Sequence, residues 1–178
     1  WDVPIVIRMD SGFFDQKIFT LCEALQIGFI CGGKMYKDIK EMAGQCDPSA
    51  WRRFESGKKN AWQYIEFGCR RGNWNRFRRA IFCRLIHDGD QLLLPGFRPD
   101  TVIVTNIGQG QAVDWMLEKA GAGDYLTANG IVACYHVRGS DELANRALKD
   151  FGNEQLPFKQ FEANAAWYYT MLLGHFLL

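Results

Sequence analysis

Apolar residues in the first part of the chain form two short continuous runs on either side of a segment with helical spacing. Val3 to Met9 is predicted to be a buried strand that ends on Asp10 and a glycine turn. Between Phe13 and Gln26 apolar positions recur at intervals of three and four, which is typical of a helix. Ile27 to Cys31 is predicted to be a second buried strand. This order of elements indicates an α/β fold.

The pattern changes after Lys34, where a short helix is predicted over Tyr36 to Ala43. Runs rich in β-branched and aromatic residues, bounded by turn residues, then predict strands. These predicted strands cover Trp62 to Cys69, Phe77 to His87 and Thr101 to Asn106.

Helical spacing returns at about Gln111, breaks at residues 121–123 and resumes to about Phe151. A last helix is predicted from Phe158 to about Leu178, with its aromatic residues packed in a core. The longest apolar run, Trp167 to Leu178, has twelve residues and is interrupted by polar ones. A membrane span needs about eighteen or more, so no contact with a membrane is expected.

Four residues near the C-terminal end share one face of the predicted helix, because about 100° per residue places them within a sector of roughly 60°. They follow the spacing Y-x2-R-x3-E-x6-K, and we call them the signature: Tyr135, Arg138, Glu142 and Lys149. The carboxylate can hold a divalent ion while the ring and the cations hold a polyanion. This face therefore suits metal-dependent phosphoryl transfer on a nucleic-acid backbone.

The signature resembles the C-terminal motif of DDE transposases of bacterial insertion sequences, in which the glutamate is the third metal-binding acid. The segment V-P-I-V-I-R-M-D-S-G-F-F resembles the h-R-x-D-S-G-F motif of that family, which carries the second aspartate. The resemblance implies that Asp10 and Glu142 are two of three catalytic acids. It also implies a ribonuclease-H-like domain made of residues 1–34 and 109–178, with residues 35–108 as a small, basic, β-rich insertion.

Several expectations about function follow from the resemblance. Asp10 and Glu142 are expected to hold Mg²⁺ (or Mn²⁺), with strand nicking by water and strand transfer by a 3′-hydroxyl. Tyr135, Arg138 and Lys149 are expected to contact DNA, both transposon ends and target. A homodimer on DNA and a cytoplasmic, nucleoid-associated location in bacteria are further expectations.

The first catalytic acid of the family lies upstream of the h-R-x-D-S-G-F segment, whereas this chain begins nine residues before Asp10. The chain is therefore expected to be the C-terminal part of a transposase, inactive by itself. Leu143 stands where close relatives have an asparagine, and Asp141 adds an acid. Asp141 points about 100° away from Glu142 on a helix and is a poor substitute ligand.

Charge is distributed unevenly along a chain of otherwise ordinary globular composition. The net charge is +1, but residues 51–86, which we call the basic block, hold ten cations and two acids. Aromatic residues are interleaved with these cations, as in surfaces that bind phosphates and bases. The arginines expected to contact DNA are Arg76, Arg78 and Arg79. The alternative is an ordinary solvated strand face.

Other readings of the same residues stay open. Asp10 could simply cap a turn, and Glu142 could pair with Arg138 or Arg146 on a helix surface. The chain could then be a noncatalytic DNA-binding remnant of a transposase gene, or a structural protein without a nucleic-acid role. The six cysteines are spread singly, without the spacing of zinc ligands, so zinc is not expected.

Overall fold

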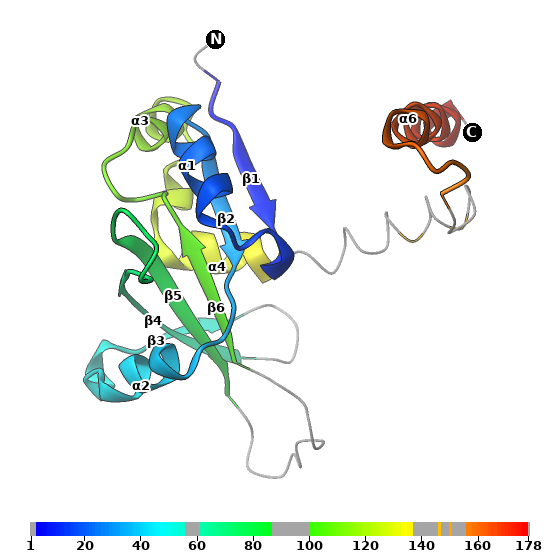
Figure 1. Cartoon of the computed structure of the whole chain (residues 1–178). Helices are drawn as coiled ribbons and strands as arrows, with labels where there is room; N and C mark the ends of the chain where they lie inside the picture. Colours follow the sequence, from blue (N-terminus) through cyan, green and yellow to red (C-terminus); the bar gives the residue numbers. More distant parts are fainter. Residues whose placement is uncertain are drawn as a thin grey trace. The chain divides into compact units, whose positions relative to one another are not determined.

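A computed structural model describes residues 3–55, 61–86, 100–136, 146, 150 and 156–177. The chain divides into two compact units, Trp1–Tyr135 and His136–Leu178. The first unit is built on a single mixed β-sheet with helices on both of its faces (Figure 1).

The sheet has six strands in the described residues, in the order β1-β2-β6-β5-β4-β3. The strands are β1 Val6–Met9, β2 Gly28–Gly32, β3 Arg52–Glu55, β4 Ala61–Cys69, β5 Arg78–Leu85 and β6 Thr101–Thr105. β1 and β2 are parallel, whereas every other neighbouring pair is antiparallel. All residues of β2 are buried, as expected for a central strand that is covered on both faces.

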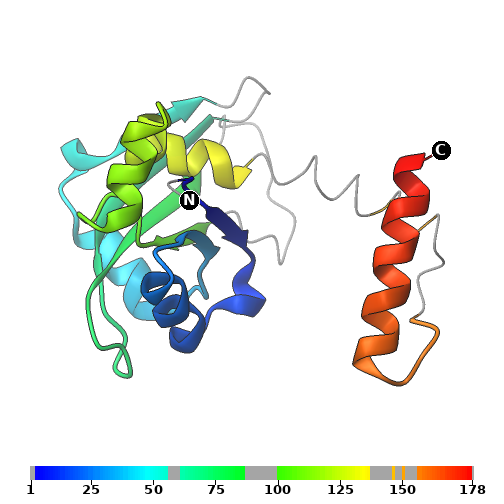
Figure 2. The same ribbon diagram turned by 90° about the horizontal axis from the view of Figure 1, so that it is seen from above.

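In the part of the first unit that the structure describes, four α-helices cover the sheet, two on each face (Figure 2). They are α1 Gln16–Ala24, α2 Lys37–Gln45, α3 Ala112–Lys119 and α4 Ala128–His136. Phe19 of α1 and Ile39 of α2 belong to one core cluster, and Val113 of α3 and Ile131 of α4 belong to the other. The described residues of this unit also form three short 3₁₀ helices: η1 Ser11–Phe13, η2 Pro48–Ala50 and η3 Gly123–Leu126.

The strands predicted within residues 35–108 are confirmed as strands β4, β5 and β6, although they do not form a sheet of their own. β6 pairs with β2, so these strands continue the sheet that β1 and β2 begin. An insertion is defined relative to other members of a family, and the predicted division into 1–34, 35–108 and 109–178 stays a prediction.

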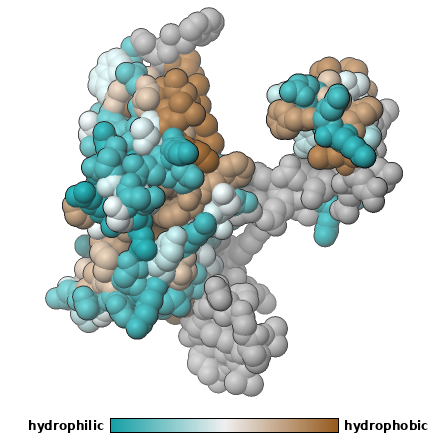
Figure 3. Space-filling view, in the orientation of Figure 1, coloured by the Kyte–Doolittle hydropathy of each residue, from teal (hydrophilic) through white to brown (hydrophobic). Residues whose placement is uncertain are grey.

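Hydrophobic side chains are exposed along the edge strand β1 and the segment before it. Val3, Ile5 and Ile7 alternate with less exposed neighbours and are 62%, 54% and 38% exposed. Figure 3 shows this apolar surface on the first unit. Within the described residues β1 pairs with β2 alone, so its other edge carries no strand partner there.

The second unit contains α6, Phe161–Leu177. Asn164 holds the turn before this helix, since its amide accepts a hydrogen bond from Phe158 N (3.0 Å) and donates one to Phe158 O (2.7 Å). Within the second unit, Phe161 and Tyr169 are exposed, so the core packing expected for the aromatic residues of α6 is not seen inside this unit. No described helix combines the length and the apolar character needed to cross a bilayer.

Candidate functional site

Asp10 lies directly after β1, at the end of the sheet where the two parallel strands finish. In the register of β1 and β2, Met9 pairs with Cys31, so Asp10 follows beside Gly32. The carboxyl ends of parallel strands are a common place for active sites. One oxygen of Asp10 accepts a hydrogen bond from Gly12 N (2.8 Å) and caps η1. The capping role that the sequence allowed is therefore real, and a catalytic role stays a prediction.

Tyr135, the first residue of the signature, lies against the same strand end. A methyl group built on Gly32 would be 2.5 Å from the Tyr135 hydroxyl oxygen and 3.4 Å from Ser11 N. Two residues that the sequence assigned to one site, Asp10 and Tyr135, are therefore brought to the same end of β1 and β2. They are 125 positions apart in sequence but share one compact unit.

The remaining signature residues, Arg138, Glu142 and Lys149, lie outside the described residues. Arg146 and Asp150, which are described, are helical, in agreement with the helix predicted there. In the described part of the chain, no three His, Cys, Asp or Glu side chains come together to form a metal site. The predicted pairing of Asp10 with Glu142 on a metal ion stays a prediction.

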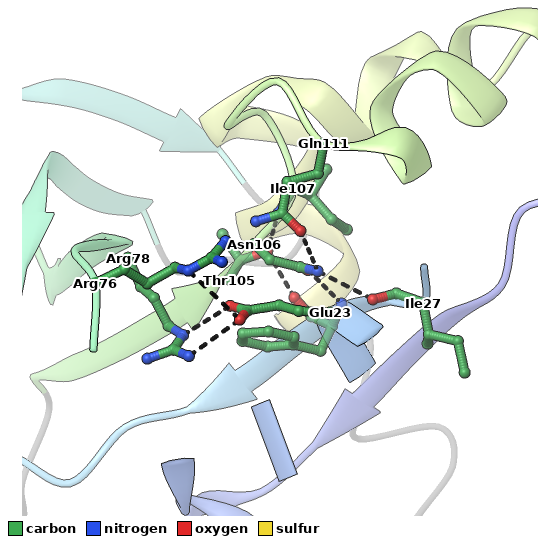
Figure 4. Close-up of polar contacts among 9 residues, drawn as sticks. Glu23, Ile27, Arg76, Arg78, Thr105, Asn106, Ile107 and Gln111 are labelled. Carbon is green, nitrogen blue, oxygen red and sulfur yellow. Dashed lines mark hydrogen bonds and ion pairs between the residues drawn. The ribbon is translucent and has the colours of Figure 1, made fainter. Parts of the chain in front are cut away.

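Arg78 of the basic block is buried in an ion pair (Figure 4). Its side chain has no exposed surface, and it donates two hydrogen bonds to the Glu23 carboxylate, at 2.9 and 3.2 Å. The guanidinium also lies over the rings of Phe19 and Trp74. Arg76 shares this carboxylate at 3.8 Å, but its side chain is 52% exposed.

Arg79 points to the face of the sheet opposite to Arg78, and its side chain also binds other residues of the protein. It pairs with Glu66 and donates hydrogen bonds to the backbone oxygens of Leu126 (2.7 Å) and Ile107 (3.2 Å). Its side chain is 14% exposed. DNA contact by the three arginines stays a prediction, and this geometry favours it for Arg76 while favouring structural roles for Arg78 and Arg79.

Sequence reasoning gave no role to Arg8, although it is the arginine of the h-R-x-D-S-G-F motif, and it did not identify Gly32 at all. Arg8 interrupts an otherwise apolar strand, which is the signal that could have drawn attention to it. It faces α4 and donates a hydrogen bond from Nη1 to the Cys134 carbonyl at 2.8 Å. Gly32 could not be recognised because nothing in the sequence shows that a tyrosine 103 positions later lies on it.

All six cysteines are free thiols. Cys31 lies next to Asp10 and donates a weak hydrogen bond to its backbone oxygen at 3.4 Å. Burial, together with the nearby Asp10 carboxylate and Cys22, raises the pKa of the Cys31 thiol to about 12. Because the thiolate is the nucleophilic form, Cys31 is a core residue rather than a reacting group.

The sequence model of the family described as transposase DDE domain, group 1, matches residues 1–178. The chain belongs to this DDE transposase family. No curated protein matches it. Membership places the chain in a class of enzymes that transfer phosphoryl groups on DNA. It also implies that DNA is the substrate.

The transposase family generally uses divalent metal ions. The donor chemistry at the end of β1 fits such an ion, because a carboxylate oxygen is a preferred ligand of Mg²⁺. Asp10 is the acid that the resemblance assigned there. The mixed α/β architecture of this transposase chain is compatible with the expected domain.

Proposed function

We propose that this chain carries the second and third catalytic acids of a DDE transposase with a ribonuclease-H-like catalytic domain. Asp10 and Glu142 would hold Mg²⁺ during strand nicking and strand transfer at transposon ends. The observation that carries the proposal is the position of Tyr135 of the signature beside the strand end that bears Asp10. The family match supports the same reaction class.

The roles of the side chains follow from their chemistry. When bound, the metal ions activate the attacking oxygen and stabilise the leaving one. Asp10 supplies carboxylate oxygens, and its bond to Gly12 N holds the carboxyl group in a defined orientation. Tyr135 offers a ring and a hydroxyl for a sugar or base next to the reacting phosphate. Arg138 and Lys149 would neutralise phosphates, the arginine in a fork of two bonds and the lysine as a point charge.

The sharpest test of Asp10 uses Asp15 as a matched control. Both carboxylates accept a hydrogen bond from the backbone N–H two residues later, at 2.8 Å for Asp10 and 2.7 Å for Asp15. Asparagine also caps helices well, so both Asn variants should fold. We expect Asp10→Asn to reduce excision of the intact element by about a hundredfold or more, because several kcal/mol of metal-supplied stabilisation are lost. Asp15→Asn should retain excision.

Glu142 is tested in the same way, with Asp141→Asn as its neighbour control. Glu142→Gln should abolish Mg²⁺-dependent cleavage while DNA binding persists. Proximity of the two acids can be measured separately, since Fe²⁺ with ascorbate and peroxide cleaves a protein backbone close to the bound ion. Cuts near residues 10 and 142 are expected, and both should be lost in Asp10→Asn. Full activity in Asp10→Asn and Glu142→Gln would exclude these two acids as the metal ligands, whereas DNA binding without any cleavage by the intact wild-type protein would favour a noncatalytic DNA-binding remnant.

A further inference from the structure

Helix α4, which carries Tyr135, is attached to the sheet near both ends by arginine side chains. Just before it begins, the Leu126 carbonyl accepts a hydrogen bond from Arg79 of β5 at 2.7 Å. In its last turn, the Cys134 carbonyl accepts one from Arg8 of β1 at 2.8 Å. Hydrogen bonds from charged donors are roughly twice as strong as neutral ones. The two arginines therefore fix the helix against two strands, β1 and β5, that are separated in the sheet by β2 and β6.

Near each end of α4 a glycine lies closely against a side chain. A methyl group on Gly32 would meet the Tyr135 hydroxyl at 2.5 Å. A methyl group on Gly108 would meet Arg79 Nη1 closely, and the backbone there has φ +76°, which favours glycine. These two glycines therefore leave the room that the Tyr135 and Arg79 side chains occupy.

The bond from Arg8 acts on the residue directly before Tyr135. Arg8 lies on β1, two positions before Asp10, and Cys134 precedes Tyr135 on α4. One hydrogen bond therefore joins the segment that carries the candidate acid to the segment that carries the candidate DNA-contacting tyrosine. Arg8 is only partly exposed, and one of its contacts is this protein carbonyl.

We infer that Arg8 is a positioning residue of the proposed site, which sets Tyr135 against Gly32 and beside Asp10. The inference rests on the proposed function, because it assumes that Tyr135 contacts DNA next to the cleaved phosphate. Displacement of a site residue by about 1 Å can reduce a rate by about a hundredfold. Losing Arg8 should therefore reduce the rate of strand cleavage without removing any group that touches DNA.

The position of Tyr135 can be read directly with 3-fluorotyrosine at that site and ¹⁹F NMR of the folded protein. Arg8→Gln should move the fluorine signal towards that of an exposed fluorotyrosine, whereas Arg8→Lys should stay closer to the native signal because it keeps a charged donor. Arg53→Gln, an exposed arginine of β3, serves as the control. A purely general loss of stability would leave the signal of the folded state unchanged.

The contact with Gly32 supplies a second measurement that does not require any change at Arg8. Gly32→Ala should raise the equilibrium constant of unfolding by about tenfold or more. The increase should be much smaller in a Tyr135→Phe background, as expected for residues in direct contact. Equal increases in both backgrounds, or an unmoved fluorine signal in Arg8→Gln, overturn the inference.

The enzymatic arm separates positioning from DNA binding. In the intact transposase, Arg8→Gln should reduce kcat for strand cleavage by about tenfold or more with KM for DNA nearly unchanged, and Arg8→Lys should recover part of the rate. A change in KM alone would identify Arg8 as a DNA contact and overturn the inference. If Asp10→Asn has no effect on cleavage, the proposed function fails, while the fluorine and Gly32 measurements still decide where Arg8 places Tyr135.

Discussion

At the residue scale, burial decides what a charged side chain of the basic block does. Arg76 and Arg78 are two positions apart and both reach Glu23, yet one is half exposed and the other fully enclosed. A buried ion pair whose partner is removed leaves an uncompensated charge. An exposed pair in water is worth little. The same residue type therefore serves the core at one position and remains accessible to a ligand at the other.

We expect Arg78→Ala to lower the free energy of unfolding by about 3 kcal/mol or more, because Glu23 loses its buried partner. Arg76→Ala should change it by less than about 1 kcal/mol. Urea unfolding of the two variants measures both values. Equal, small effects would show that Arg78 is accessible in solution and restore it as a candidate DNA contact.

At the element scale, the turn between β6 and α3 is held by hydrogen bonds to the carboxylate of a single residue, Asp114. The side chain of Asp114 accepts hydrogen bonds from the backbone N–H groups of Gly108, Gly110 and Gln111, at 2.8, 2.7 and 3.1 Å. Both glycines have positive φ. The Gly-Gln-Gly segment is therefore a helix-capping turn whose amides are occupied by a carboxylate of the chain itself.

Asp114→Ala should lower the free energy of unfolding by about 2 kcal/mol, since hydrogen bonds to a charged acceptor contribute about 1.5–3 kcal/mol and water replaces part of them. Glu118→Ala, one turn later on the same helix, is the matched control and should stay within about 0.5 kcal/mol of the wild type. Thermal or urea unfolding compares them. A loss equal to that of the control would mean that the turn keeps its conformation without the cap.

The elements themselves were largely predictable, whereas their partners were not. The spacing of apolar residues predicted strands close to β1, β2, β4, β5 and β6. β3 escaped because Arg52–Glu55 is too short and charged to show an alternating pattern. Its strand conformation comes from pairing with β4. Contacts such as Glu23 with Arg78, 55 positions apart, depend on the three-dimensional register, and the sequence does not show which residues face each other.

At the scale of the whole molecule, the expectation of DNA binding now falls on the exposed arginines. Arg52 and Arg70 are exposed, like Arg76, and each phosphate neutralised contributes about −0.9 to the slope of log K against log salt on duplex DNA. Removing Arg78 or Arg79 would confuse lost binding with lost structure. The exposed positions can be changed without that difficulty.

Arg52→Ala combined with Arg76→Ala should make this slope less negative by about two units, roughly one for each lost contact. Lys37→Ala, whose side chain is 92% exposed and lies outside the basic block, should leave the slope unchanged. Fluorescence anisotropy of a labelled duplex across a salt series gives the slopes. An unaltered slope in the double variant would make the basic block a solvated face.

The bond between Arg8 and Cys134 also has a consequence for the order in which the molecule forms. It joins residues 126 positions apart in sequence. By contrast, β4 and β5 are joined by a short turn and form eight residue pairs, from Cys69 with Arg78 to Trp62 with Leu85. Contacts between distant residues carry a larger loop-closure cost and tend to form late. We therefore expect Arg8→Gln to speed unfolding and leave refolding nearly unchanged, as stopped-flow kinetics can show. The contact between β1 and the end of α4, which holds Tyr135 beside Gly32, would then be the last part of the first unit to assemble and the first to open.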